Sequence, residues 1–74
     1  MVKKEYRILG KVDGFHQFRR NLQSEAIKFN TRVPRFESGA VPFIFISLNI
    51  SPDMVSEVEE LIMVIAEKSG VKVE

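Results

Sequence analysis

The strongest constraint on the fold is the stretch VPFIFISLNI, residues 41–50, in which apolar side chains occupy both alternating sets of positions. Strand neighbours point to opposite faces of a sheet, so a strand that is apolar on both faces belongs in the middle of that sheet. Such a strand needs a hydrogen-bonded neighbour on each side and apolar cover on its faces. The rest of this short chain must supply both.

A helix is predicted directly after this strand. Its ends carry four signals, which are Ser51 as N-cap, Pro52 at the first helical position, Asp53 in the first turn and Gly70 after the last turn. Its core-facing stripe consists of Val55, Val58, Ile62 and Ile65. Residues 61–66, LIMVIA, are apolar on every side of the helix. Met63 and Val64 therefore face either another subunit or a groove within the same subunit.

The first half of the chain predicts a strand and then a helix. Residues 4–12, KEYRILGKV, alternate, with Tyr6, Ile8, Gly10 and Val12 on one side and Arg7, Leu9 and Lys11 on the other. The helix is expected to follow, with Asp13 as its N-cap. Its apolar residues recur at helical spacing, namely Phe15, Phe18, Leu22, Ala26 and Phe29, and Arg19 and Arg20 are expected on its exposed flank.

Two shorter strands complete the pattern. Residues 28–36, KFNTRVPRF, suit an edge strand because Pro34 cannot donate to a β-ladder. Residues 37–40, ESGA, predict a turn, and VKVE at 71–74 closes as a strand. The order β-α-β-β-α-β predicts one α+β domain spanning residues 1–74. We expect the ferredoxin-like two-layer sandwich, in which a four-stranded antiparallel sheet carries both helices on one face.

Size and composition narrow the class of function. A chain of 74 residues buries only about 60% of its unfolded surface, so a partner surface would help its marginal core. The sequence contains no cysteine and one histidine, which leaves no disulfide framework and no thiolate or imidazole metal cluster. We therefore predict no metal and no cofactor, and expect oligomerisation to stabilise the fold. Neither a signal-type apolar segment nor a membrane span is visible, so we expect a cytoplasmic protein with no membrane partner.

Charge is divided between the two halves of the chain. Residues 1–37 carry nine Lys or Arg against four acids, net +5, whereas residues 38–74 carry two against six, net −4. Such a division indicates a basic binding face, two complementary faces that meet in a self-assembly, or simply the solvation of each half.

An uncovered sheet face follows from the predicted fold. If the isoleucines of residues 41–50 face the helices, then Phe43, Phe45, Ser47 and Asn49 line the other side, beside Arg7, Leu9 and Lys11. FIF at 43–45 resembles the aromatic-x-aromatic core of RNA-recognition domains, which implies base stacking, although Pro42 replaces the usual basic-glycine pair. Burial against a second copy is the use that we favour. The predicted interface residues are Leu9, Phe43, Phe45, Met63 and Val64, and the nucleic-acid alternative adds Arg7, Lys11, Arg32 and Arg35.

The stretch GKVDGFHQFRRN, residues 10–21, resembles the phosphate loop G-R-V-Q-G-V-x-F-R of acylphosphatases. That resemblance implies an anion cradle at a helix start and hydrolase activity. The spacing from Gly14 to the first arginine is one residue longer here, and Arg35 stands where that family has the asparagine that holds the attacking water. We therefore predict no catalytic residues and keep an acylphosphatase-like hydrolase as the second alternative.

Two further resemblances indicate regulation. VDGFHQF, residues 12–18, is similar to the Asp-x-x-Gly-apolar turn of ACT domains, which pair through their sheets and bind small ligands. YRILG, PRFESGAVPFIFISLNIS and GVKV resemble the strands of the small YbeD-type proteins. Both imply a non-enzymatic regulatory or protein-interaction domain. The predicted ligand-binding residues are Lys11, Asp13, Gly14, Phe15 and His16, with an N-cap role for Asp13 and a solvent-facing His16 as their structural alternatives.

Overall fold

The structure is a computed structural model, and it describes residues 1–35 and 41–74. Its elements follow in the order β1 (Val2–Leu9), α1 (Val12–Ser24), β2 (Asn30–Arg32), β3 (Phe43–Ile50), η1 (Pro52–Met54), α2 (Val55–Ser69) and β4 (Lys72–Val73). η1 is a single turn of 3₁₀-helix. The turn predicted at residues 37–40 lies outside the described residues.

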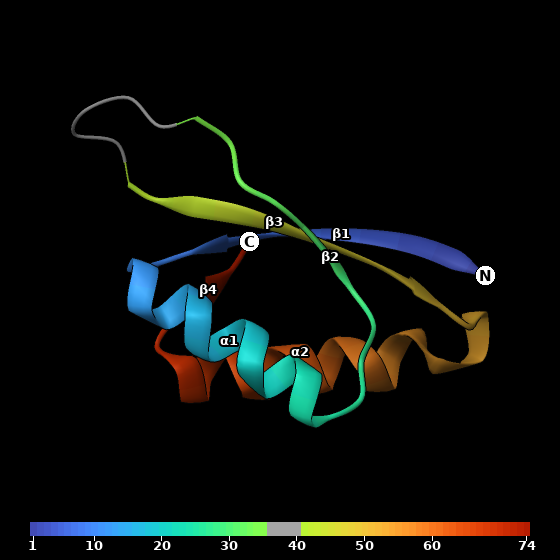
Figure 1. The fold of residues 1–74 in the computed structure, drawn as a ribbon. Helices are drawn as coiled ribbons and strands as arrows, with labels where there is room; N and C mark the ends of the chain where they lie inside the picture. Colours follow the sequence, from blue (N-terminus) through green and yellow to red (C-terminus); the bar gives the residue numbers. More distant parts are fainter. Residues whose placement is uncertain (36–40) are drawn as a thin grey trace.

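The strands form a four-stranded sheet in the order β2-β3-β1-β4. All the paired strands are antiparallel, and the β1–β3 ladder runs from Val2 opposite Ile50 to Leu9 opposite Phe43. β2 is an edge strand, as Pro34 predicted, and β3 is central. With α1 and α2 on one side of the sheet (Figure 1), this is the predicted ferredoxin-like α+β sandwich.

The core lies between the sheet and the two helices (Figure 1). Alternate residues of β3 point into it because strand neighbours face opposite sides, and the isoleucines take the helix side. The buried apolar residues are Ile8, Phe15, Phe18, Leu22, Ile44, Ile46, Leu48, Ile50, Ile62, Ile65, Ala66 and Val71. The apolar stripes predicted for both helices thus supply much of this core. Within the described chain, neither helix is long and apolar enough to cross a bilayer.

The signal predicted for the C-terminus of α2 is confirmed, but the predicted N-terminus was wrong: α2 begins at Val55 with Met54 as its N-cap. Ser51, Pro52 and Asp53 instead begin the 3₁₀ turn η1, where Ser51 makes no side-chain capping hydrogen bond and the Met54 N–H donates to the Ser51 carbonyl at 2.8 Å. Gly70 ends α2 in the left-handed conformation at φ 72°. The Val71 N–H then donates to the Ala66 carbonyl at 3.1 Å, a contact that closes the last turn.

The prediction for α1 was wrong at both ends. The helix begins at Val12, so Asp13 lies inside its first turn, and the N-cap is Lys11, whose side chain makes no capping hydrogen bond. Val12 is therefore a helical residue and 58% exposed instead of the core-facing end of a strand. A carboxylate in the first turn still opposes the positive end of the helix dipole, which gives Asp13 a stabilising role without a cap.

At its other end, α1 stops at Ser24 and does not extend to Phe29. Ala26 takes a left-handed conformation at φ 59°. Its N–H donates to the Gln23 carbonyl at 3.0 Å, and the Ile27 N–H donates to the Leu22 carbonyl at 3.2 Å. These two bonds make a Schellman termination, which usually has glycine at the left-handed position. Alanine there hid the helix end from sequence analysis.

We predict that Ala26→Gly stabilises the protein by about 1 kcal/mol, because it removes the steric cost of a Cβ in the left-handed region. Urea unfolding followed by circular dichroism measures the change. Ser24→Gly is the matched control: it lies within the last turn, where glycine should cost about 0.5–1 kcal/mol. An Ala26→Gly protein no more stable than the wild type would contradict this account of the helix end.

Tyr6 places a hydroxyl between the sheet and the helices. This hydroxyl is buried and has no hydrogen-bond partner within the described residues. Burial and, to a lesser extent, the Glu59 carboxylate raise the pKa of Tyr6 above its ordinary value of 10.0. The folded state therefore holds this proton more tightly than the unfolded state. Below pH 10, Tyr6 is protonated in both states, and this protonation difference costs no stability. As the pH rises from there through the folded-state pKa, the unfolded state loses the proton first and the free energy of unfolding falls.

We predict that Tyr6→Phe stabilises the protein at neutral pH by about 1 kcal/mol, since it removes a buried hydroxyl that lacks a partner. The wild type should also lose more stability than Tyr6→Phe above about pH 10. Urea unfolding of both proteins over an alkaline pH series measures the difference, and tyrosinate absorbance reports Tyr6 directly, because it is the one tyrosine in the chain. Parallel stability curves for the two proteins would contradict the assignment.

Candidate functional site

The sheet has one face turned away from the helices, which we call the open face. Residues directly opposite each other in an antiparallel pair share a face, so the strand registers define its members. They are Lys3, Glu5, Arg7 and Leu9 of β1, Asn30 and Arg32 of β2, Phe43, Phe45, Ser47 and Asn49 of β3, and Lys72 of β4. The predicted placement of Phe43 and Phe45 on this face is confirmed.

Phe43 and Phe45 form the apolar centre of the open face. Their ring centroids lie 5.4 Å apart, and the rings meet edge to face at 87°. Two residues that are two positions apart on a strand point the same way, which brings the rings together, and an edge-to-face pair stabilises by about 0.5–1.5 kcal/mol beyond its buried area. Both rings are half-buried even though no helix covers this face.

Two arginines supply part of that cover. The Arg32 guanidinium carbon lies 4.1 Å from the centroid of the Phe45 ring, directly across from it in the β2–β3 ladder. The Arg7 guanidinium carbon lies 5.5 Å from the centroid of Phe43, its diagonal neighbour. Guanidinium groups are attracted to aromatic faces, by about 0.5–1 kcal/mol at exposed sites. The open face is therefore a cationic layer over an aromatic pair.

Each of these arginines also has a carboxylate partner. The Arg32 Nη2 lies 3.6 Å from the Glu5 Oε1, and the Arg7 guanidinium pairs with the Glu74 carboxylate. All four side chains are more than 40% exposed, so each ion pair stabilises weakly. The pairs nevertheless neutralise the cations that lie over the rings. Only Lys3 and Lys72, near the two ends of β1, add charge to the open face without a described carboxylate partner.

The sequence analysis placed the wrong second base on this face. It paired Lys11 with Arg7, but β1 ends at Leu9 and Lys11 lies at the start of α1. Arg32 on β2, across from Phe45, is the second base beside the rings. The sequence predicts it there only for the nucleic-acid alternative, because its neighbour across the sheet depends on the β2–β3 register, which the hydrophobic pattern of so short a strand does not fix.

The predicted ligand loop is the first turn of α1, because Gly10 and Lys11 alone connect β1 to the helix. Lys11, Asp13 and His16 are exposed there, whereas Phe15 is 6% exposed and belongs to the core. Gly14 faces β4 and the end of α2. A Cβ at that position would lie 2.8 Å from the Val71 Cγ1 and 3.1 Å from the Ser69 carbonyl, so this glycine is required for close packing.

Met63 and Val64 lie on the outer side of α2 and are 55% and 44% exposed. They line a shallow cavity of about 360 Å³ whose other wall includes Val71, Lys72 and Val73 at β4. This surface lies at the β4 edge of the sheet, so these two residues belong to a different surface from the open face. Leu9, the third predicted interface residue on the sheet, lies opposite Phe43.

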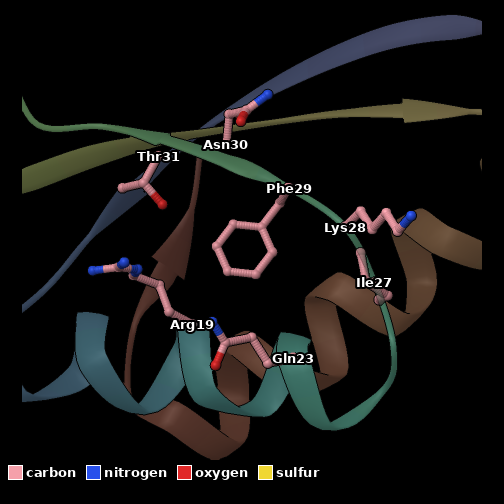
Figure 2. A pocket seen from close by; sticks show the side chains of 7 residues that line it. All are labelled: Arg19, Gln23, Ile27, Lys28, Phe29, Asn30 and Thr31. Carbon is pink, nitrogen blue, oxygen red and sulfur yellow. The ribbon is translucent and has the colours of Figure 1, made fainter.

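A cleft between α1 and β2 is a feature that sequence analysis missed. Figure 2 shows the Phe29 ring between these elements, with Arg19 and Gln23 on the helix and Thr31 on the strand. Arg19 was expected on an exposed flank, but it is half-buried, and its Nε is buried with no hydrogen-bond partner among the described residues. The premature end of α1 creates this cleft, because the chain from Ala26 to Phe29 crosses to the sheet there.

Comparison with known proteins adds no family to this description: the chain matches no protein-family model, no curated protein and no solved structure.

We predict that Arg32 and Phe45 stabilise the fold cooperatively. A double-mutant cycle of Arg32→Met and Phe45→Leu should give a coupling of about 0.5–1 kcal/mol in the free energy of unfolding, measured by urea unfolding at high dilution. The control cycle combines Lys3→Met with Phe45→Leu. Lys3 lies on the same face but opposite Asn49, so its coupling should be near zero. Equal couplings in the two cycles would contradict a specific contact.

Proposed function

We propose that this protein is a small, non-enzymatic regulatory or protein-interaction domain that forms a homodimer through its open face. The observation that supports this is the edge-to-face pair of Phe43 and Phe45, only partly buried at the centre of a sheet face that neither helix covers. An aromatic centre with a polar rim is the usual composition of a protein interface. Leu9, opposite Phe43, extends the apolar centre onto β1.

The charges around this pair favour a protein partner. Arg7 and Arg32 already pair with Glu74 and Glu5, so the surroundings of the rings are close to neutral. A twofold dimer brings the same patch of both subunits together. An arginine of one subunit can then exchange its intramolecular carboxylate for that of the other subunit, with little change in the number of ion pairs. The charges beside the rings are thus compatible with a second copy, and the positive charges of Lys3 and Lys72 lie toward the two ends of β1.

Met63 and Val64 offer a second surface at the β4 edge, where two sheets would join side by side. This edge and the centre of the open face are alternative twofold contacts in this proposal, because Met63 and Val64 lie on the outer side of α2 whereas the rings lie on the sheet face without helices. The open face is the stronger candidate because its two aromatic rings bury more area than one methionine and one valine. The edge surface provides the competing arrangement for the experiment.

We expect the wild type to sediment as a dimer at micromolar concentrations and Phe45→Glu to sediment as a monomer. A buried phenylalanine contributes about 1.5–3 kcal/mol, and a twofold interface loses two of them, so the dissociation constant should rise at least about 100-fold. Met63→Glu tests the edge surface. Met54→Glu, an exposed apolar position in η1, is the matched control and should remain dimeric.

A monomeric wild type would remove the dimer proposal, and a dimer lost in Met63→Glu but retained in Phe45→Glu would move the interface to the β4 edge.

Nucleic-acid binding is the second candidate, supported by the guanidinium groups beside two aromatic rings on a sheet face. A monomer that binds a single-stranded oligouridylate, with an affinity that falls steeply with salt and is lost in Phe45→Glu, would replace the dimer with this function.

We propose no catalytic residue. Hydrolysis of the acylphosphatase type would need backbone amides of a loop around the anion, whereas two residues connect β1 to α1 here. Arg19, the arginine nearest to the expected position, lies in the second turn of α1 and lines the cleft toward β2. This geometry supports a binding role for the helix side of the molecule.

A further inference from the structure

The cleft between α1 and β2 consists of two adjoining cavities. The larger one, of about 460 Å³, has a mainly polar lining that includes Gln23, Lys28 and Asn30. The smaller one, of about 220 Å³, is lined mainly by Val12, Phe15, Val33 and Ile44. Arg19 and Thr31 line both cavities, so a cation and a hydroxyl stand where the polar and apolar parts meet. The cleft is therefore amphipathic along its length.

The charge in this cleft is of one sign. Arg19 and Lys28 line it, and no aspartate or glutamate does so within the described part of the chain. Arg19 has no carboxylate within ion-pair distance among the described residues, unlike Arg7 and Arg32. Its buried Nε lacks an acceptor there. A half-buried guanidinium in this condition attracts an oxyanion, because carboxylate and phosphate oxygens match its planar set of donors.

The apolar end of the cleft has exposed surface to cover. Val12 and Val33 are 58% and 65% exposed, although they adjoin the core residues Phe15 and Ile44. A cavity of about 150 Å³ with an apolar lining can hold benzene, so the smaller cavity has room for one ring or a short alkyl chain. A ligand that filled it would bury both valines.

We propose that the α1–β2 cleft binds a small amphiphile whose carboxylate or phosphate pairs with Arg19 and whose apolar body lies between Val12 and Val33. The Thr31 hydroxyl, beside Arg19 at the junction, donates a second hydrogen bond to the oxyanion. This site lies on the helix side of the sheet and shares no residue with the Phe43–Phe45 pair. It can therefore be occupied whether or not the open face forms a dimer.

The test is a ¹H–¹⁵N NMR titration with two probes that share an oxyanion and an apolar body, 3-phenylpropionate and phenylphosphate. We expect shifts of the α1 and β2 amides that line the cleft, and the stronger probe identifies the preferred head group. Inorganic phosphate, which lacks the apolar body, and 3-phenylpropan-1-ol, which lacks the charge, should each bind at least about tenfold more weakly.

Arg19→Gln should lower the affinity for whichever of the two probes binds more tightly by about tenfold or more. Arg20→Gln removes the same charge from the next residue, which is exposed and lines neither cavity, and should change the affinity less than about twofold. Val33→Asp, at an exposed position, keeps the test valid if Arg19→Gln does not fold. It should weaken binding as strongly, whereas Val41→Asp, equally exposed and outside the cleft, should not.

The proposal fails if neither probe shifts the cleft amides at millimolar concentration. It also fails if Arg20→Gln weakens binding as much as Arg19→Gln, because attraction would then come from the general charge of α1. These outcomes are separate from the sedimentation result, which reports only on the open face and the β4 edge.

Discussion

The antiparallel ladder between β1 and β3 organises this protein. It joins the two longest strands along their whole length, from Val2 opposite Ile50 to Leu9 opposite Phe43. Its alternation assigns every side chain to one of two faces, and both helices cover the same one. The isoleucines of β3 are buried beneath the helices, while Phe43 and Phe45 must lie on the side without helices. The core and the open face are thus two results of one register.

The open face shows how a one-sided sheet accommodates aromatic residues. The rings pack edge to face on each other, and two arginines from neighbouring strands lie over them. The guanidinium groups shield the rings from water and remain hydrated themselves, because each side chain is partly exposed. Glu5 and Glu74 balance these cations. These contacts give the aromatic pair partial cover within one subunit, and the proposed dimer would complete it.

The short edge strands of the sheet explain the cleft between α1 and β2. β2 and β4 pair over only three and two residues. Beyond β2, the chain from Ala26 to Phe29 runs between the end of α1 and the sheet, and Phe29 packs against the core from the side. This leaves a cleft in which Arg19 is half-buried without a carboxylate partner in the described chain. If α1 were one turn longer, the chain would cross to the sheet farther along and would not form this cleft.

The element order, the central place of β3, the edge place of β2 and the two faces of the sheet can all be predicted from the amino-acid sequence. These follow from alternation, helical spacing and the terminal signals at Pro52 and Gly70, all of which are local. The end of α1 could not be predicted from such local patterns, because Ala26 adopts a left-handed conformation that favours glycine, and alanine gives no signal for it.

The contacts between individual side chains become visible only in the folded protein. Lys11 does not lie on the open face because β1 ends at Leu9, and the β2–β3 register places Arg32 opposite Phe45. Gly14, which is predicted to bind a ligand, is also the point where α1 approaches Val71. The unpartnered Arg19 depends on where the chain crosses from helix to strand. Each of these contacts joins residues that are distant in the sequence or separated by an irregular segment, and periodic patterns carry no information about such distances.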